Sequence, residues 1–165
     1  MILLKKAKES DIPVIQEIAK ITWGPTYVPI IGQAQVDYML DKMYSKAALE
    51  SQFIDGHHFL IAEQGSKHVG FVSYAVEPEE AGVFHLHKLY VLPTAHGQGI
   101  GKFLINEVVN KVREEGGRYL RLNVNRNNKA KDFYERSGFK IKETVDIEIG
   151  NGFYMNDYVM EKTIE

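Results

Sequence analysis

Cysteine is absent from this chain of 165 residues, which excludes a disulfide framework, a thiol nucleophile and a thiolate zinc site. No apolar run approaches the roughly 20 residues that a membrane-spanning helix needs, and the first ten residues lack the long apolar core of a signal peptide. An excess of one charge is also lacking, because the formal net charge is only -2. That balance favours neither nucleic acid nor an anionic membrane as a partner. We therefore expect a cytoplasmic protein that binds neither.

The chain does contain enough apolar sequence for one core. Hydrophobic residues make up 44% and charged residues 25%, which is typical of a globular protein. A chain of this length buries roughly 70% of the surface that it exposes when unfolded, so it can fold without disulfide bonds. No repeat, low-complexity tract or linker divides it. We expect a single domain over residues 1–165.

Hydrophobic periodicity predicts alternating strands and helices. The predicted strands cover residues 3–7, 58–63, 69–76, 83–92, 118–124, 139–149 and 153–162. The first predicted helix has Ser10 as its N-cap, and the others cover 33–52, 100–115 and 128–137. The stretch 23–32, with its glycines and prolines, predicts a loop between the first two helices. This order predicts an α/β fold with a mixed sheet.

The fourth predicted strand has a break in its alternation. Its apolar residues switch from even to odd numbers between Leu86 and Leu89, which predicts a β-bulge near His87 and Lys88. The alternative is a two-sided strand whose polar residues face solvent.

A glycine-rich turn, HGQGIGK at residues 96–102, separates this strand from a long amphipathic helix. Free N–H groups and the positive end of the helix dipole make such a turn suited to phosphate. The P-loop pattern fails at His96 and Phe103, and the dinucleotide-binding pattern fails at Lys102. Taken alone, such a turn is more often a tight connection between a strand and a helix without a ligand.

Two motifs together resemble one family. Residues 89–105, LYVLPTAHGQGIGKFLI, resemble the signature [QR]-x-x-G-x-[GA] of the GNAT N-acetyltransferases, with Gly99 and Gly101 at the small positions. His96 occupies the place of the usual Gln or Arg. Residues 127–139, NNKAKDFYERSGF, resemble the family's N-x-x-A-x-x-[FL]-Y-E-x-x-G-F.

The resemblance implies a mixed, mostly antiparallel sheet with helices on both faces and a cleft where the fourth and fifth strands splay apart. It implies direct transfer of an acetyl group from acetyl-CoA to an amine of a small molecule or peptide, without a metal, by a monomer or homodimer. The alternative is a module with the same fold that binds the coenzyme to sense or scaffold without turnover.

The resemblance also implies where acetyl-CoA binds. Backbone groups of Leu89, Tyr90 and Val91 would pair with the pantetheine arm and the acetyl oxygen. The second motif would contact the thiol end through Asn127 and Ala130, although Asn127 is equally explained as a helix N-cap. The pyrophosphate would lie on the turn formed by Gly97, Gln98, Gly99, Ile100, Gly101 and Lys102.

A lysine-like amine has a pKa near ~10.4, so deprotonation at pH 7 costs about 4.6 kcal/mol and a base is useful. His85 and His87 occupy strand positions where relatives often carry Glu, and a neutral His can serve as the base, with His87 favoured of the two. They are equally explained as ordinary strand histidines. Their spacing also suits a metal, but no third ligand is apparent, so we expect none. By resemblance, Tyr134 would protonate the departing thiolate, while the alternative is a core aromatic.

The acceptor side is assigned by resemblance to the first two helices, loosely like bacterial polyamine acetyltransferases. Trp23 and Tyr27 would wall the amine pocket, and Glu77, in an acidic loop, would attract a cationic amine. The alternatives are that Trp23 ends a core stripe and that Glu77 belongs to a solvated turn.

Overall fold

The computed structural model describes residues 1–165 as one seven-stranded sheet with five α-helices. The strands are β1 (Ile2–Lys6), β2 (His58–Gln64), β3 (Lys67–Val76), β4 (Val83–Val91), β5 (Tyr119–Asn125), β6 (Lys140–Gly150) and β7 (Phe153–Thr163). The helices are α1 (Ile12–Ile31), α2 (Gln33–Tyr44), α3 (Lys46–Ile54), α4 (Ile100–Glu114) and α5 (Ala130–Arg136). Short 3₁₀ turns precede α1 (η1, Glu9–Asp11) and α4 (η2, Pro93–Ala95).

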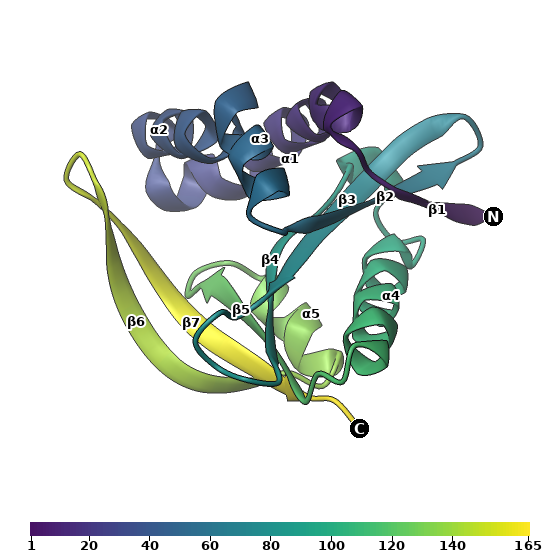
Figure 1. Cartoon of the computed structure of the whole chain (residues 1–165). Coiled ribbons are helices and arrows are strands. Elements are labelled where there is room, and N and C mark those ends of the chain that lie inside the picture. The colour runs from purple at the N-terminus through teal and green to yellow at the C-terminus, as the bar shows by residue number, and fades with distance from the viewer.

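The strands lie in the order β1-β2-β3-β4-β5-β7-β6, and every neighbouring pair is antiparallel except β4 with β5. Helices α1, α2 and α3 gather on one face, and α4 and α5 lie on the other (Figure 1). The predicted mixed, mostly antiparallel sheet with helices on both faces is therefore confirmed. No helix is both long and apolar enough to cross a membrane.

Two apolar layers hold these helices against the sheet. Under α4 and α5, the larger cluster joins Leu104 and Val108 to Leu86, Leu120 and Met160. Under α1–α3, the second cluster joins helical residues to the opposite face of β2 and β3. Farther along that face, polar residues of β5 and β7, namely Asn123, Asn125 and Asp157, line a hollow together with residues of α1 and α2. The hairpin of β6 and β7 reaches up toward α2 (Figure 1).

The predicted bulge in β4 is present. Ser73 of β3 pairs with Lys88, and the next residue, Tyr74, pairs with Leu86, so His87 is an extra residue without a partner. The bulge places Leu86 and Leu89 on the same face of the sheet in spite of their numbering. Parallel pairing of β4 with β5 also ends at Leu86 and Leu122, so the two strands part beyond the bulge.

The predicted loop at residues 23–32 is wrong, because α1 continues to Ile31 with Pro25 and Pro29 inside it. Each proline removes one helical hydrogen bond from the carbonyl four residues before it. Ile21, Pro25 and Pro29 are all exposed, so solvent satisfies the freed carbonyls. Proline normally ends a helix, but here both prolines lie on the exposed side of a helix whose other side is packed in the core.

Two smaller expectations are also corrected. Ser45 divides the predicted 33–52 helix into α2 and α3, and its side chain accepts a hydrogen bond from the backbone N–H of Ala48. The predicted cap Ser10 lies inside η1, and the residue before α1 is Asp11. The Asp11 carboxylate instead accepts from the backbone N–H of Lys8 and pairs with Lys5 at 2.9 Å.

Candidate functional site

Three adjoining hollows cross the sheet where β4 and β5 part, and they share lining residues. We call them the glycine-turn groove, the splay pocket and the inner pocket. The groove and the splay pocket have Leu89, Val91 and Tyr134 in common, among others. The splay pocket and the inner pocket have His87 and Asn123 in common. Together they form one path from the N-terminus of α4 to the space beneath α1 and α2.

The glycine-turn groove lies at the start of α4, and its lining includes Gly97, Gly99, Ile100, Gly101 and Lys102. Gly97 and Gly99 have φ of 81° and 76°, a left-handed conformation that favours glycine. The space beside Gly99 is open, and the first-turn N–H groups of α4 have no helical acceptor. This arrangement fits a bound phosphate.

Gly101 has a different role, because a Cβ there would lie 3.2 Å from the Phe133 ring of α5. The residue is small so that α4 and α5 can approach each other. Arg136, at the end of α5, also lines the glycine-turn groove and adds a cation that the sequence reasoning did not include among the site residues. Gln98 lines none of the three hollows, and its side-chain oxygen accepts from Gln64 at 2.6 Å.

His96 turns back onto the strand. Its Nε2 donates to the carbonyl oxygen of Val91 at 2.9 Å, which ties the glycine turn to the end of β4. The imidazole still borders both the groove and the splay pocket. The residue at the place of the family's Gln or Arg is therefore engaged in holding the backbone of the turn.

The splay pocket lies between the separated strands. Leu89, Tyr90 and Val91 border it from β4, and Ala130 and Tyr134 border it from α5. Tyr134 is buried, and desolvation raises the pKa of its phenol, so the hydroxyl stays protonated and able to donate.

Asn127 does not cap α5 and lies exposed outside all three hollows. The side-chain oxygen of the neighbouring Asn128 instead accepts from the backbone N–H of Ala130, and Asn128 borders the splay pocket. The N-cap alternative for Asn127 is therefore wrong, because the residue that directly precedes α5 is Lys129.

The inner pocket has an aromatic wall from α1. Trp23 is 2% exposed, and its ring lies 4.6 Å from Tyr27 and 5.9 Å from Tyr90, measured between centroids. The Tyr27 hydroxyl lies 3.3 Å from that of Tyr90 and accepts from the Asn128 amide at 3.4 Å. Trp23 is thus both a core residue and a wall of the pocket.

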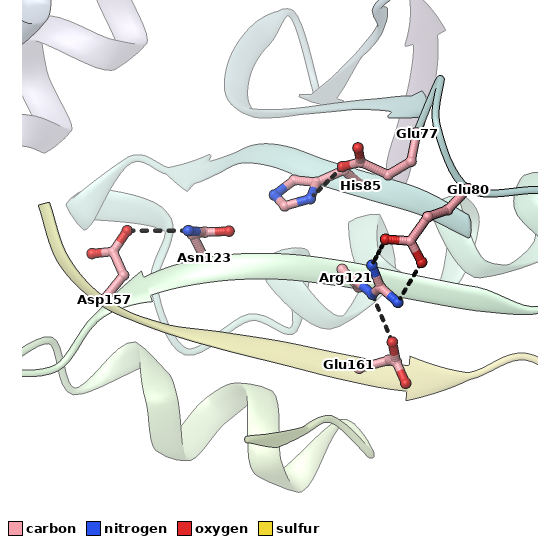
Figure 2. Close-up of polar contacts among 7 residues, drawn as sticks. All are labelled: Glu77, Glu80, His85, Arg121, Asn123, Asp157 and Glu161. Carbon is pink, nitrogen blue, oxygen red and sulfur yellow. Dashed lines mark hydrogen bonds and ion pairs between the residues drawn. The ribbon is translucent and has the colours of Figure 1, made fainter. Parts of the chain in front are cut away.

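His85 and His87 lie together on β4, with ring centroids 4.6 Å apart, and His57 stacks on His87 at 4.5 Å. Both strand histidines border the inner pocket. Glu77 borders none of the three hollows and stands behind His85, whose Nδ1 donates to the Glu77 carboxylate at 2.9 Å (Figure 2). The expectation that Glu77 faces the pocket is therefore corrected, because its carboxylate is used on the imidazole.

Both histidines are neutral at pH 7. Desolvation by the groups around the ring, and then the nearby His85, His57 and Lys88, lower the pKa of His87 to about 2, although the residue itself is exposed. Desolvation also lowers the pKa of His85, but there the Glu77 carboxylate opposes the change. Arg121, which pairs with Glu80 and Glu161 in Figure 2, lowers the pKa of His85 slightly further. His85 is accordingly the more basic of the two.

Two charged residues that the sequence reasoning missed also border the inner pocket, Lys88 from β4 and Asp157 from β7. Lys88 is 5% exposed, donates to the Gln52 amide oxygen at 2.9 Å and lies over the Tyr44 ring. Desolvation lowers its pKa to about 8. Asp157 is 3% exposed, and Asn123 faces it at 3.5 Å (Figure 2).

Comparison with known proteins agrees with this geometry. The model of the acetyltransferase (GNAT) domain matches residues 27–162. The chain belongs to the GNAT acetyltransferase family. It is 28% identical to the spermidine N(1)-acetyltransferase of Thermoplasma acidophilum, over 98% of this chain and 97% of that protein.

Solved structures of GNAT proteins share the fold. The PaiA N-acetyltransferase of Thermoplasma acidophilum, crystallised in complex with coenzyme A, superposes with a TM-score of 0.83 at 27% identity, covering 99% of both chains. Ard1 of Thermoplasma volcanium superposes with a TM-score of 0.75 at 17% identity, covering 99% of this chain and 98% of that one, which shows a common fold.

Lys88 gives a test of the charge buried at this site. Burial lowers the pKa of Lys88 to about 8, from 10.5 in the unfolded chain. Between pH 8 and pH 10.5 the unfolded chain therefore binds the proton more tightly than the folded protein, and the free energy of unfolding rises with pH in this range. Lys88→Met should therefore raise the free energy of unfolding at pH 7 by up to about 3 kcal/mol, with the gain shrinking toward pH 10. Urea unfolding at both pH values measures this. The exposed Lys46→Met is the control, and a destabilised Lys88→Met protein at pH 7 would contradict the expectation.

Proposed function

We propose that this protein transfers the acetyl group of acetyl-CoA directly to the primary amine of a small acceptor. The observation that carries the proposal is the connected path of three hollows, with Tyr134 and His87 bordering its middle section. A phosphate-binding turn lies at one end of this path and an aromatic pocket at the other. The inner pocket has a volume of about 180 Å³, somewhat more than the roughly 150 Å³ that accommodates benzene, so a small acceptor fits better than a folded chain.

The residues present suit acetyl-CoA, which supplies an acetyl thioester. N–H groups from Gly97 to Lys102 would hold the pyrophosphate, with Lys102 and Arg136 as nearby cations. Backbone groups of Leu89 to Val91 have no partner on β5 and would pair with the amides of the pantetheine arm. In support, a similar structure contains coenzyme A.

In the proposed reaction the neutral amine forms a C–N bond to the acetyl carbon while the C–S bond breaks. Tyr134 would donate its proton to the sulfur, because its buried phenol stays protonated and borders the splay pocket. The absence of cysteine agrees with direct transfer rather than an acyl-thiol intermediate on the protein.

The proton of the ammonium would leave toward the two histidines. His87 borders both the splay pocket and the inner pocket, so it lies where the amine meets the thioester. Its low pKa makes it a poor final acceptor. The Nδ1–H group of His85 donates a hydrogen bond to Glu77, which leaves Nε2 as the free acceptor. The carboxylate then stabilises the imidazolium that forms when Nε2 takes the proton. Glu77 is then a positioning residue.

The aromatic wall suits an acceptor that arrives as an ammonium. Trp23 and Tyr27 would attract the cation with about 0.5–2 kcal/mol. That attraction must stay modest, because the amine reacts only after it loses its proton. The similar spermidine N(1)-acetyltransferase supports a polyamine as one candidate.

The direct test is thiol release from acetyl-CoA with a panel of small primary amines, with the products identified by mass spectrometry. An acetylated amine formed in step with the released thiol is the expected result. Calorimetric binding of acetyl-CoA without turnover on any amine would support the coenzyme-binding sensor instead.

The glycine turn is tested by Gly99→Glu. The variant places a side chain and a negative charge where the phosphates would lie, in a backbone with φ of 76°. Calorimetry should show coenzyme A binding weakened by about tenfold or more, about 1.4 kcal/mol. Gly116→Glu is the matched control, since it has φ of 79° and open space at the opposite end of α4. Unchanged affinity in a folded Gly99→Glu protein would remove the phosphate site from this turn.

Tyr134→Phe should retain coenzyme binding and lower kcat by about 100-fold, the lower end of the usual range for general acid catalysis. Such a pattern places the hydroxyl in the transition state rather than in binding. Tyr74→Phe is the control, because Tyr74 is equally buried but lies outside the three hollows. An equal kcat for Tyr134→Phe and the unaltered protein, with chemistry rate-limiting, would reduce Tyr134 to a packing residue.

The base is tested by the pH profile of kcat. A lowered pKa keeps His85 neutral above it, so activity should be lost only as the pH falls below the ordinary histidine range. Glu77→Gln removes the group that raises the pKa of His85, so the acidic limb of the kcat profile should move to lower pH. His85→Ala should lower kcat and abolish that limb. Glu79→Gln, an exposed neighbour, should leave the profile unchanged. If Glu77→Gln leaves the limb in place, the proton takes another route.

A further inference from the structure

We propose that Asp157 binds a second ammonium group of the acceptor, which makes it a specificity-determining residue for diamines and longer polyamines. This inference rests on the proposed amine acetylation and names its acceptor class. No motif and no pattern in the sequence pointed to this residue, because it lies inside β7, far from both signature motifs.

The carboxylate of Asp157 is buried but almost without partners. The residue is 3% exposed and forms no ion pair, and its only side-chain hydrogen bond is a 3.5 Å contact from the amide of Asn123. That distance is at the limit of a hydrogen bond. A buried carboxylate lowers the stability of a protein unless a charge or several donors compensate it. Desolvation raises the pKa of Asp157, while the Asn123 amide and the charge of Arg126, which itself pairs with Asp146, lower it in part. A bound cation would offset the remaining cost.

The carboxylate also borders a cavity, so a ligand can supply the missing partner. Alternation along β7 places Asp157 on the same face as Val159 and Glu161, opposite the face that packs Met160 under α4. That side of the sheet faces α1 and α2, whose side chains complete the lining of the inner pocket. Asn125 of β5 and Val145 of β6 pair with Asp157 on either side, so its position is fixed by two neighbouring strands.

Asp157 is placed to hold a group that does not react. It borders the inner pocket but not the splay pocket, whereas the adjacent Asn123 borders both. A nitrogen at the junction near His87 would meet the thioester, and a nitrogen at Asp157 would remain outside the reaction. The same inner pocket is also lined by apolar side chains, among them Ile31, Met39 and Met155, which suit a chain of methylene groups.

Neither Glu77 nor Lys88, the other charged residues near the inner pocket, is placed to bind the second ammonium group. Glu77 is occupied by His85, as Figure 2 shows, and does not reach the pocket. Lys88 donates to Gln52 and lies over the Tyr44 ring, so its ammonium is held under α3 and forms no pair with Asp157. Asp157 is therefore the one carboxylate that borders the pocket.

A matched pair of acceptors tests the assignment: butylamine, which has one nitrogen, and 1,4-diaminobutane, which adds a second ammonium to the same chain. The unaltered protein should use the diamine about tenfold more efficiently in kcat/KM. Asp157→Asn should remove that preference by raising KM for the diamine about tenfold more than KM for butylamine, about 1.4 kcal/mol. Asp41→Asn, an exposed aspartate on α2, is the isosteric control that should preserve the preference.

Asp157→Glu tests the same assignment while the negative charge is kept. Its carboxylate reaches further into the pocket, so the best diamine should become shorter by about one methylene when a series of chain lengths is compared. An equal fall in kcat for both acceptors in Asp157→Asn would overturn the proposal, because it would show a role in proton transfer. Unchanged kinetics would overturn it as well. An unaltered protein that acetylates no amine at all would defeat the proposed function itself.

Discussion

At His87 the β4 strand has one residue more than its neighbour β3, and its parallel pairing with β5 has just ended at Leu86. A strand that continued its pairing would seal the sheet and leave no room between α5 and β4. The bulge instead frees the backbone of Leu89 to Val91 on the side that faced β5 and turns His87 toward the gap. The splay pocket, the connection to the glycine turn and the approach to the inner pocket all depend on this one extra residue.

Burial of charge is the second constraint. Lys88 and Asp157 border one pocket from opposite strands without pairing, and each is almost fully buried. Such groups lower stability, and proteins tend to retain them where function needs them. Lys88 is compensated by an amide oxygen and aromatic faces, while Asp157 has one long contact. The partners of Lys88 therefore account for its burial within the protein, whereas the Asp157 carboxylate is suited to binding a ligand.

Local signals predicted much of this architecture. The break in parity between Leu86 and Leu89 indicated the bulge, and the two motifs indicated the family. The helix through Pro25 and Pro29 was missed because tertiary packing of Trp23 and its neighbours outweighs the local preference of proline. Asp157 and Asn123 come together only through long-range pairing of β5 with β7, which no local pattern specifies. Glu77 was placed near the right residues, but its contact with His85 depends on how the connection after β3 folds.

The three hollows adjoin one another and form one path, along which the thioester would reach the amine. A crystal structure with a bisubstrate analogue, in which an acetyl spacer joins coenzyme A to an amine, tests this most directly. We predict density for the pyrophosphate at residues 97–102, for the pantetheine arm between β4 and β5, and for the amine beside His87 beneath Trp23 and Tyr27. An analogue bound with its arm outside the gap between β4 and β5, or with its amine outside the inner pocket, would contradict the account.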